Sequence, residues 1–433
     1  MTTDPGIRDF RVLWCGESVS LLGDRVATFA VPTLAILTLH ASTGEVGLLT
    51  MATYVAYPVA GLGAGLLVDR YTRRRMMLLA GVARLGLYLS IPLAQHHGML
   101  TIEQLLLVVA VSGCFTMVYD VALQGYLPLL LPGARLPRGN AAVEFSRTTS
   151  QVVGPALGGA LAGAFGAVAA VTLNALSFAG SIAGVSALRT REPAVRPRAS
   201  RDTASARLRE GFAFVLAHDV LRPLTLSAAA RNLGITMTKT AIYLYAYRAL
   251  GLSVGAMGLI LAVGAVTAVL GASTAGLVTR RLGYGRTLLC TAGEGFVWLL
   301  VPLALLGHPA LVLGVIVAAA APWLPIWNSQ VATARQVLAP PELQSRVLAS
   351  IRTIAWGTLP LGSLLGGGLA AVLVAALGER AGLALTIVAG GLIATCALRP
   401  LLTPAVRDLR DVPLAPRPVG QPVGGPQIAG ARP

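Results

Sequence analysis

The sequence consists mainly of long apolar stretches separated by short polar loops. Of its 433 residues, 55% are hydrophobic and only 12% are charged, and the mean hydropathy is +0.72. Soluble domains carry roughly 25% charged residues, so this chain has too few charges to cover a surface that faces water. A helix that crosses a bilayer needs roughly 20 apolar residues, and the sequence therefore predicts an all-α membrane protein of about twelve transmembrane helices.

A polar segment at residues 189–220, rich in proline and arginine, divides the apolar stretches into two sets. We expect residues 1–188 to form an N-terminal six-helix half and residues 221–401 a C-terminal six-helix half. The segment between them would be a cytoplasmic central loop with a short amphipathic helix at 206–221, for which binding of a partner protein is the alternative role. Residues 402–433, rich in proline and glycine, would be a disordered cytoplasmic tail. The predicted helices are 11–39, 46–68, 76–94, 104–127, 141–165, 167–188, 221–250, 255–278, 287–306, 310–331, 347–377 and 381–401.

The arginines between these helices indicate the orientation of the chain. They occupy every second loop and both termini, whereas the alternate loops, such as 41–45, 94–100 and 307–309, are nearly free of them. By the positive-inside rule, the arginine-bearing loops and both termini are expected to be cytoplasmic in a bacterial inner (plasma) membrane. The loops account for the net charge of +16, so the lipid bilayer rather than nucleic acid is the expected partner. No cleavable signal peptide is expected, because the first apolar stretch has full spanning length.

The two halves repeat short sequence patterns. Residues 65–75 close the second predicted helix with a glycine followed by a basic cluster, and residues 276–286 close the eighth in the same layout. The glycines of 154–159 in the fifth helix are echoed by those of 362–367 in the eleventh. Two parallel copies of one unit are a known transporter architecture, with the substrate site between the halves near the bilayer midplane.

These patterns resemble the major facilitator superfamily, over nearly the whole chain. Residues 65–75 resemble its signature between helices 2 and 3, and Gly154-Pro-Ala-Leu-Gly158-Gly159 resembles the helix 5 signature of its antiporters. Phe10-Arg-Val-Leu-Trp14 and Ser20-Leu-Leu-Gly23-Asp24 resemble the macrolide-efflux and siderophore-exporter branch of drug:proton antiporters. The resemblance implies a monomer whose partners are protons and a small-molecule substrate. The sequence departs from the pattern in two places, because helix 4 (107–126) lacks an arginine and Arg280 replaces the second signature aspartate.

Charged residues inside apolar helices are the candidates for proton coupling or substrate binding. A charge at the centre of a membrane helix costs roughly 2.5–3.5 kcal/mol, so it is retained for a reason. Each candidate has a structural alternative, an ion pair that fixes helix packing. Glu144 and Arg147, roughly one turn apart, are expected to form a surface ion pair, and Arg231 with Lys239 would attract an anionic substrate group or pair with a carboxylate. The candidates are Asp24, Arg25, Arg84, Asp120, Arg231 and Glu294.

Two motifs are expected to control conformation. A cytoplasmic gate would hold the halves together by ion pairs or by capping a facing helix, or else its charges only set the topology. Its residues are Gly65, Asp69, Arg70, Arg73 and Arg74. The antiporter-like motif of helix 5 would bend that helix and let it pack closely, with packing alone as the alternative. Its residues are Gly154, Pro155, Gly158 and Gly159.

The remaining residue types argue against enzymatic chemistry. The single lysine, Lys239, follows a threonine rather than a glycine, so there is no phosphate-binding loop. The histidines and cysteines have no metal or redox spacing, and no cofactor or metal is expected. The sequence therefore favours a proton-coupled efflux transporter for a small hydrophobic or amphiphilic compound, such as an antibiotic, natural product or siderophore-like molecule. The alternatives are an importer of the same fold and a non-transporting membrane sensor or scaffold.

Overall fold

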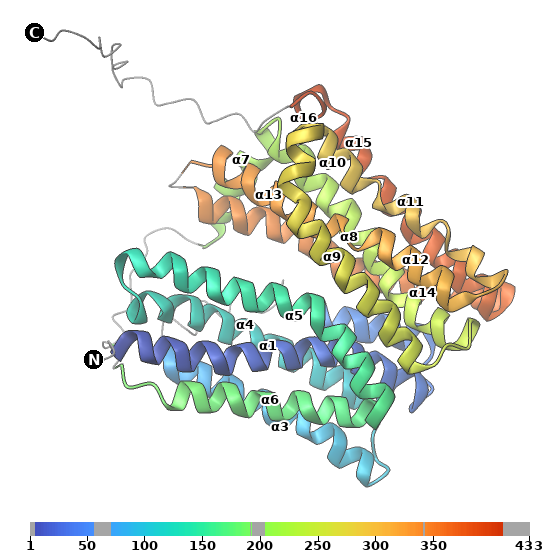
Figure 1. Ribbon diagram of the computed structural model, residues 1–433, viewed down its shortest axis with the longest axis horizontal. Coiled ribbons are helices and arrows are strands. Elements are labelled where there is room, and N and C mark those ends of the chain that lie inside the picture. The colour runs from blue at the N-terminus through green and yellow to red at the C-terminus, as the bar shows by residue number, and fades with distance from the viewer. Residues whose placement is uncertain (1–4, 56–70, 191, 193–203, 341–342, 410–433) are drawn as a thin grey trace, which may run out of the picture.

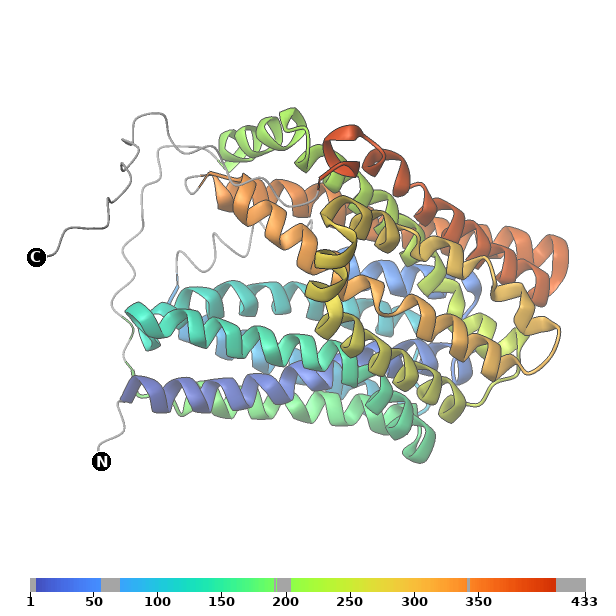
Figure 2. The same cartoon turned by 45° about the horizontal axis from the view of Figure 1, so that its top comes forward.

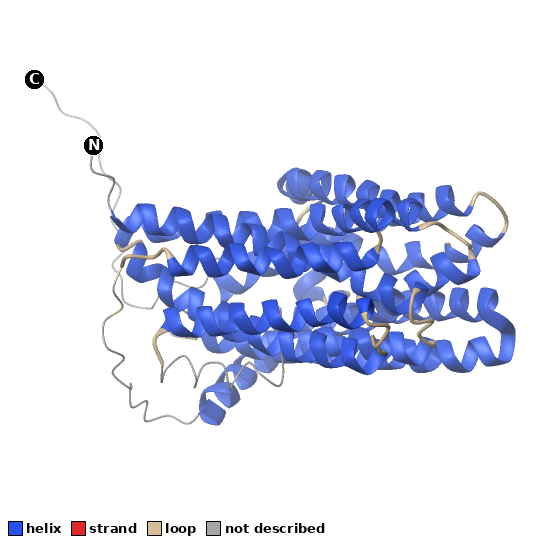
Figure 3. Ribbon diagram, turned by 90° about the horizontal axis from the view of Figure 1, so that it is seen from below, coloured by secondary structure: helices blue, strands red, loops and turns tan. Residues whose placement is uncertain are grey.

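The computed structural model of the protein describes residues 5–55, 71–190, 192, 204–340 and 343–409. Within these ranges the chain forms helices and loops and no strand (Figure 3). Residues 43–55 are also helical. The elements are α1 (Pro5–Leu37), α3 (Arg73–His96), α4 (Ile102–Leu130), η1 (Gly133–Arg135), α5 (Leu136–Phe165), α6 (Ala167–Ser186), α7 (Ala204–Ala217), α8 (Leu221–Leu244), η2 (Tyr245–Ala249), α9 (Val254–Leu282), α10 (Tyr284–Ala292), α11 (Glu294–Trp298), η3 (Val301–Leu305), α12 (Pro309–Ala320), α13 (Trp323–Leu338), α14 (Gln344–Thr395), α15 (Leu398–Leu401) and α16 (Pro404–Arg407).

Among the described residues, 8 helices are long and apolar enough to cross a membrane, or 9 if the bent pair formed by α7 and α8 is one span. The expected number of about twelve is thus not reached by this measure. One reason is that α14 contains two of the predicted spans: it has 52 residues, and its backbone leaves the helical conformation at Gly378, where φ is 79°. Another is that α5 is not among these helices, and that the second predicted span, 46–68, lies partly outside the described residues. The ninth predicted span is broken into α10, α11 and η3 but still counts as one span, Tyr284–Leu305.

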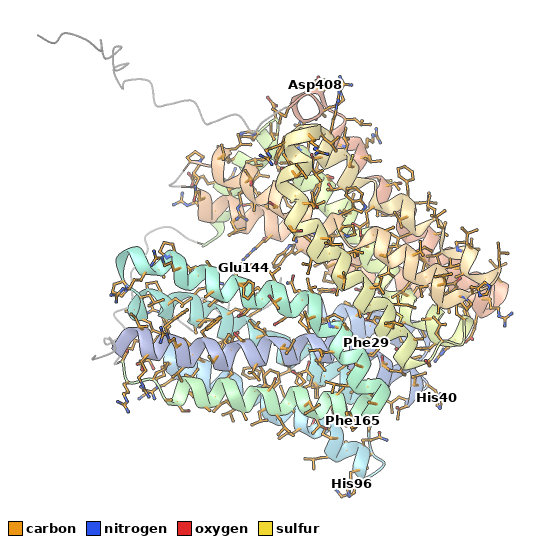
Figure 4. The ribbon with its side chains drawn as sticks, viewed as in Figure 1. Phe29, His40, His96, Glu144, Phe165 and Asp408 are labelled. Atoms are coloured by element: carbon orange, nitrogen blue, oxygen red, sulfur yellow. The ribbon has the colours of Figure 1, made fainter. Side chains whose placement is uncertain are left out.

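The helices form two bundles. In the first, α1 packs against α5 and α6, and α3 packs against α4 and α6; in the second, α8 packs along α14, and α9 packs against α12 and α13. The two bundles approach each other where α5 meets α9, and they diverge toward the end at which α1 begins (Figures 1 and 2). Figure 4 places Phe29 near the end at which the bundles meet and Glu144 nearer the end at which they diverge.

Glycines explain why the same packing occurs in both halves. A Cβ on Gly154 would lie 2.1 Å from the Cβ of Arg25 on α1, and one on Gly158 would lie 2.8 Å from the carbonyl oxygen of Val26. In the second half, Gly362 and Gly366 bring α14 equally close to Leu233 and Met237 of α8. Only glycine permits such approach between helices. The expected repeat of the fifth helix in the eleventh is therefore present in the packing.

The next glycine of each motif joins the two bundles. A Cβ on Gly159 would lie 2.2 Å from the Cα of Gly258 on α9, and one on Gly367 would lie 2.7 Å from the Cα of Gly47. We call these two contacts the glycine seam. The seam is symmetric, because the fifth helix touches the second bundle in the way that the eleventh touches the first.

The structure describes the first residues of the predicted tail, 402–409, and α16 lies within them. Val406 of α16 is fully buried, and the backbone N–H of Gly285 donates to the carbonyl of Leu409 at 2.9 Å. One apolar side chain and one backbone hydrogen bond tie this turn to α10. The rest of the predicted tail, 410–433, lies outside the described residues.

A Gly159→Leu substitution tests the glycine seam. The side chain would meet the backbone of Gly258, so we expect separation of α5 from α9 and a cost of about 1–3 kcal/mol to the conformation seen here. The measurement is oxidative cross-linking between Gly163→Cys and Gly255→Cys, which also face each other across the bundles, in a chain without its 4 native cysteines. Cross-linking should fall in Gly159→Leu and persist in Gly276→Leu, whose added Cβ meets nothing within 4 Å. Equal cross-linking in both variants would contradict the seam.

Candidate functional site

An ion pair between the first and third helices lies inside the N-terminal bundle. Asp24 of α1 accepts a hydrogen bond from the guanidinium of Arg84 on α3. The Arg84 side chain is 3% exposed and that of Asp24 is 26% exposed, so only the carboxylate reaches toward solvent. The Arg84 guanidinium also lies 4.1 Å from the centre of the Phe178 ring on α6, a cation–π contact. Arg25, the sequence neighbour of Asp24, instead faces Gly154 of α5.

A second ion pair joins the corresponding helices of the other bundle. Arg231 of α8 donates to Glu294, the first residue of α11. Both side chains are buried, at 4% and 8% exposed. Of the two roles expected for Arg231, attraction of an anionic substrate group and pairing with a carboxylate, the second is the contact present in this structure. Lys239 on the same helix is exposed.

The two ion pairs have opposite polarity. In the first bundle the acid is on α1 and the base on α3, whereas in the second the base is on α8 and the acid on α11. In each pair the Nε of the arginine is buried and has no hydrogen-bond partner. Arg84 and Glu294, predicted to occupy matching positions of the two halves, thus take matching places with opposite charge.

The third group of charges connects α4 and α5. The guanidinium of Arg147 lies 3.2 Å from a carboxylate oxygen of Asp120 and 4.0 Å from one of Glu144. Arg147 and Asp120 are partly buried, whereas Glu144 is 71% exposed. The expected pair of Glu144 with Arg147 is therefore the weaker contact, and Arg147 is mainly the partner of Asp120. Asp120 is the only charge inside the membrane part of helix 4, so this contact compensates it.

Glu17 is a buried carboxyl group that the sequence reasoning missed. It lies on α1, its residue is 3% exposed, and its Oε2 has no hydrogen-bond partner. Tyr119 of α4 is one of its neighbours, and the Tyr119 hydroxyl accepts a hydrogen bond from Ser181 of α6 at 2.8 Å. A signal for it existed in the sequence: Glu17 precedes Asp24 by seven residues, about two helical turns, and so lies on the same face of α1.

Only two of the predicted gate residues can be placed. Gly65, Asp69 and Arg70 lie outside the described residues. Arg73 pairs with Glu192 at 3.1 Å, and Arg74 donates to the carbonyl of Ser186 at 2.7 Å. Arg73 thus joins the central segment to the first bundle, and Arg74 contacts the end of α6. Neither of these two contacts reaches the second bundle.

Contacts between the bundles gather at the opposite end of α1. Thr33 and Tyr247 share a hydrogen bond of 3.0 Å between their hydroxyls, and Arg248 donates to the carbonyl of Ala41 at 2.7 Å. The Phe29 ring meets that of Tyr243 edge to face at 5.8 Å. Together with the glycine seam, these contacts close the molecule at one end.

The arrangement suits charge compensation and proton binding. Each bundle keeps charged groups in its interior, and each buried arginine faces a carboxylate. A carboxyl group next to such a pair, as Glu17 is, can gain or lose a proton and so change the local charge.

The sequence matches the Major Facilitator Superfamily over residues 13–358. It is 29% identical to the multidrug efflux pump Tap of Mycobacterium tuberculosis over 424 residues, which cover 94% of this chain and 95% of that protein. It is 32% identical over 166 residues to an uncharacterized MFS-type transporter, YfiS, of Bacillus subtilis, and that alignment covers 38% of this chain and 39% of YfiS. Macrolide efflux protein A of Streptococcus pyogenes is 28% identical over 34% of this chain and 36% of its own length.

Solved structures share the fold at low sequence identity. A mutant of the nucleoside transporter NupG aligns with a TM-score of 0.71 and 11% identity, covering 92% of this chain and 100% of that one. A bacterial homologue of the iron transporter ferroportin, in an inward-facing state, aligns with a TM-score of 0.70 and 16% identity, covering 92% of this chain and 99% of that one.

Proposed function

The chain belongs to the major facilitator superfamily, and from that premise we propose that it exports a small hydrophobic or amphiphilic compound in exchange for protons. The observation that carries this proposal is the alignment with the multidrug efflux pump Tap, which extends over 94% of this chain and 95% of the pump. The similarity to macrolide efflux protein A supports the same direction of transport. An antibiotic or another natural product is the class of substrate that both names suggest.

The position of the closed end supports an alternating-access cycle. The contacts of Thr33, Arg248 and the glycine seam lie at the end of α1 that the loop arginines assign to the outside of the bacterial inner membrane. With both termini in the cytoplasm, this conformation would receive its substrate from the cytoplasm. Opening of the outer contacts, and formation of inner contacts by the predicted gate residues, would then release the substrate outside.

The ion pairs fit a rigid frame within each moving half. Because the pairs Asp24–Arg84 and Arg231–Glu294 each join helices of one bundle, they do not have to break when the bundles rock against each other. Proton coupling would arise where a carboxyl group is not permanently paired.

Everted membrane vesicles test the direction and the coupling. Such vesicles, energised to an acidic interior, should show a loss of interior acidity when erythromycin is added, because protons leave as the compound enters the vesicle. The measurement is the recovery of a quenched pH-sensitive dye, with vesicles lacking the protein as the control. Uptake of labelled erythromycin by intact cells, rather than its loss from them, would contradict export. Absence of any erythromycin-dependent proton flux would remove this substrate class.

A further inference from the structure

Among the described residues around α1, one buried carboxyl group is not part of an ion pair. Arg84 has Asp24 as its partner, and Arg147 has Asp120. Glu17 lies among these groups, 3% exposed, and one of its oxygens meets no donor. An ionised carboxylate buried without a partner is so costly that such a group takes up a proton instead.

The surroundings of Glu17 contain groups of both signs. On its own helix Asp24 repels its negative charge, and on α4 Asp120 does the same, while Arg84 on α3 attracts it. Arg147 of α5 is a second cation that interacts with it. The neutral groups are Tyr119 on α4 and Ser181 on α6. Small changes in this balance would decide whether Glu17 holds its proton.

The second bundle has no such group at the matching place. Glu17 precedes Asp24 by seven residues, and the residue seven positions before Arg231 is Leu224, an apolar side chain 2% exposed. Both bundles thus have the ion pair, but only the first has the additional acid. The ion pair is the shared structural element, and Glu17 is what distinguishes the first bundle.

We propose that Glu17, rather than the ion-paired Asp24, is the residue that carries the exchanged proton. This inference rests on the proposed function of proton-coupled export. The Tyr119 hydroxyl positions the carboxyl group, and Ser181 positions Tyr119. Asp24 and Arg84 supply a fixed pair of charges that Glu17 senses.

The step is a proton transfer without redox chemistry. A proton from water adds to a carboxylate oxygen of Glu17, which forms an O–H bond and removes one negative charge from the bundle. When the substrate enters, the O–H bond breaks and the proton returns to water. The electron pair stays on the oxygen, so the exchange of one proton needs no further reactant.

Infrared spectroscopy tests the protonation without any substrate. In detergent-solubilised protein at neutral pH, the carbonyl stretch of a protonated carboxylic acid should be present in the unmodified chain and absent from Glu17→Gln. Glu144→Gln, which neutralises an exposed carboxylate, is the matched control and should keep the band. In Tyr119→Phe the band should shift, because the carboxyl group loses a neighbouring hydroxyl. A band that is unchanged in both Glu17→Gln and Tyr119→Phe would overturn the proposal.

Transport in proteoliposomes tests the coupling. Glu17→Gln should lose accumulation of labelled erythromycin driven by a pH gradient by about tenfold or more, whereas Glu144→Gln, which neutralises an exposed carboxylate, should accumulate it within about twofold of the unmodified chain. A Glu17→Gln protein that still accumulates erythromycin under the gradient would overturn the role of Glu17. If the unmodified protein itself moves no erythromycin, the proposed function fails for this compound, whereas the infrared result still decides the state of Glu17.

Discussion

Replacement of Glu294 by glutamine is expected to destabilise the protein by about 3–5 kcal/mol, because it leaves a buried arginine without its counter-ion. Arg231 is 4% exposed, so water cannot replace the lost carboxylate. The measurement is the free energy of unfolding from a denaturant titration in detergent micelles. In Arg231→Met combined with Glu294→Met, both charges are removed together, and most of the stability should return.

Glu379→Gln is the matched control for this prediction. The Glu379 carboxylate lies 3.8 Å from Arg248, but its side chain is 49% exposed. An exposed ion pair contributes about 0–1 kcal/mol, so this variant should remain close to the unmodified chain. Equal losses in Glu294→Gln and Glu379→Gln would mean that burial does not govern the energy of these pairs.

The combination of Glu17→Gln with Asp24→Asn is expected to destabilise the protein by more than the sum of the single changes, with an excess of about 1–3 kcal/mol. Both carboxyl groups interact with the same buried guanidinium, that of Arg84. In Asp24→Asn, Glu17 can lose its proton and become the new counter-ion. In the double variant no carboxylate remains on α1 to compensate Arg84.

A double-mutant cycle measures this excess, with unfolding in detergent as the readout. The matched cycle combines Glu17→Gln with Glu144→Gln, whose carboxylate is exposed and contacts Arg147. That cycle should be additive within about 0.5 kcal/mol. Infrared spectra add an independent check, since Asp24→Asn alone should lose the acid band of Glu17. Additive losses in both cycles would separate Glu17 from Arg84.

Much of the fold follows from features that the sequence displays directly. Hydropathy predicts the spans, and the glycine motifs of 154–159 and 362–367 predict two related bundles. The predicted spans 347–377 and 381–401 end and begin on either side of Gly378, where the backbone turns within α14. The break at Gly293, which separates α10 from α11, was not predicted. A window average over hydropathy does not detect the break at Gly293, because it alters backbone angles and leaves the composition apolar.

The site was predictable in its residue types but not in its pairing. Sequence reasoning selected Asp24, Arg84, Arg231 and Glu294 because charges are rare in apolar helices. It did not assign Arg84 to Asp24 or Arg231 to Glu294, since partners on different helices depend on the rotation of each helix about its axis. Glu17 was missed because it lies nearer the start of α1, where a charge could reach water, and only the packing of α4 and α6 shows that it cannot.

The sequence by itself determined the solvent of this chain, because the free energy of placing apolar helices in lipid is a sum over residues and needs no knowledge of their neighbours. It also determined the repeat, because glycines at matching positions permit the same close approach in each half. Only the tertiary structure decided which charges compensate each other and which carboxyl group is left over. The energy of a buried charge depends on the distance to its partner and on the exclusion of water, and both exist only after the helices have packed.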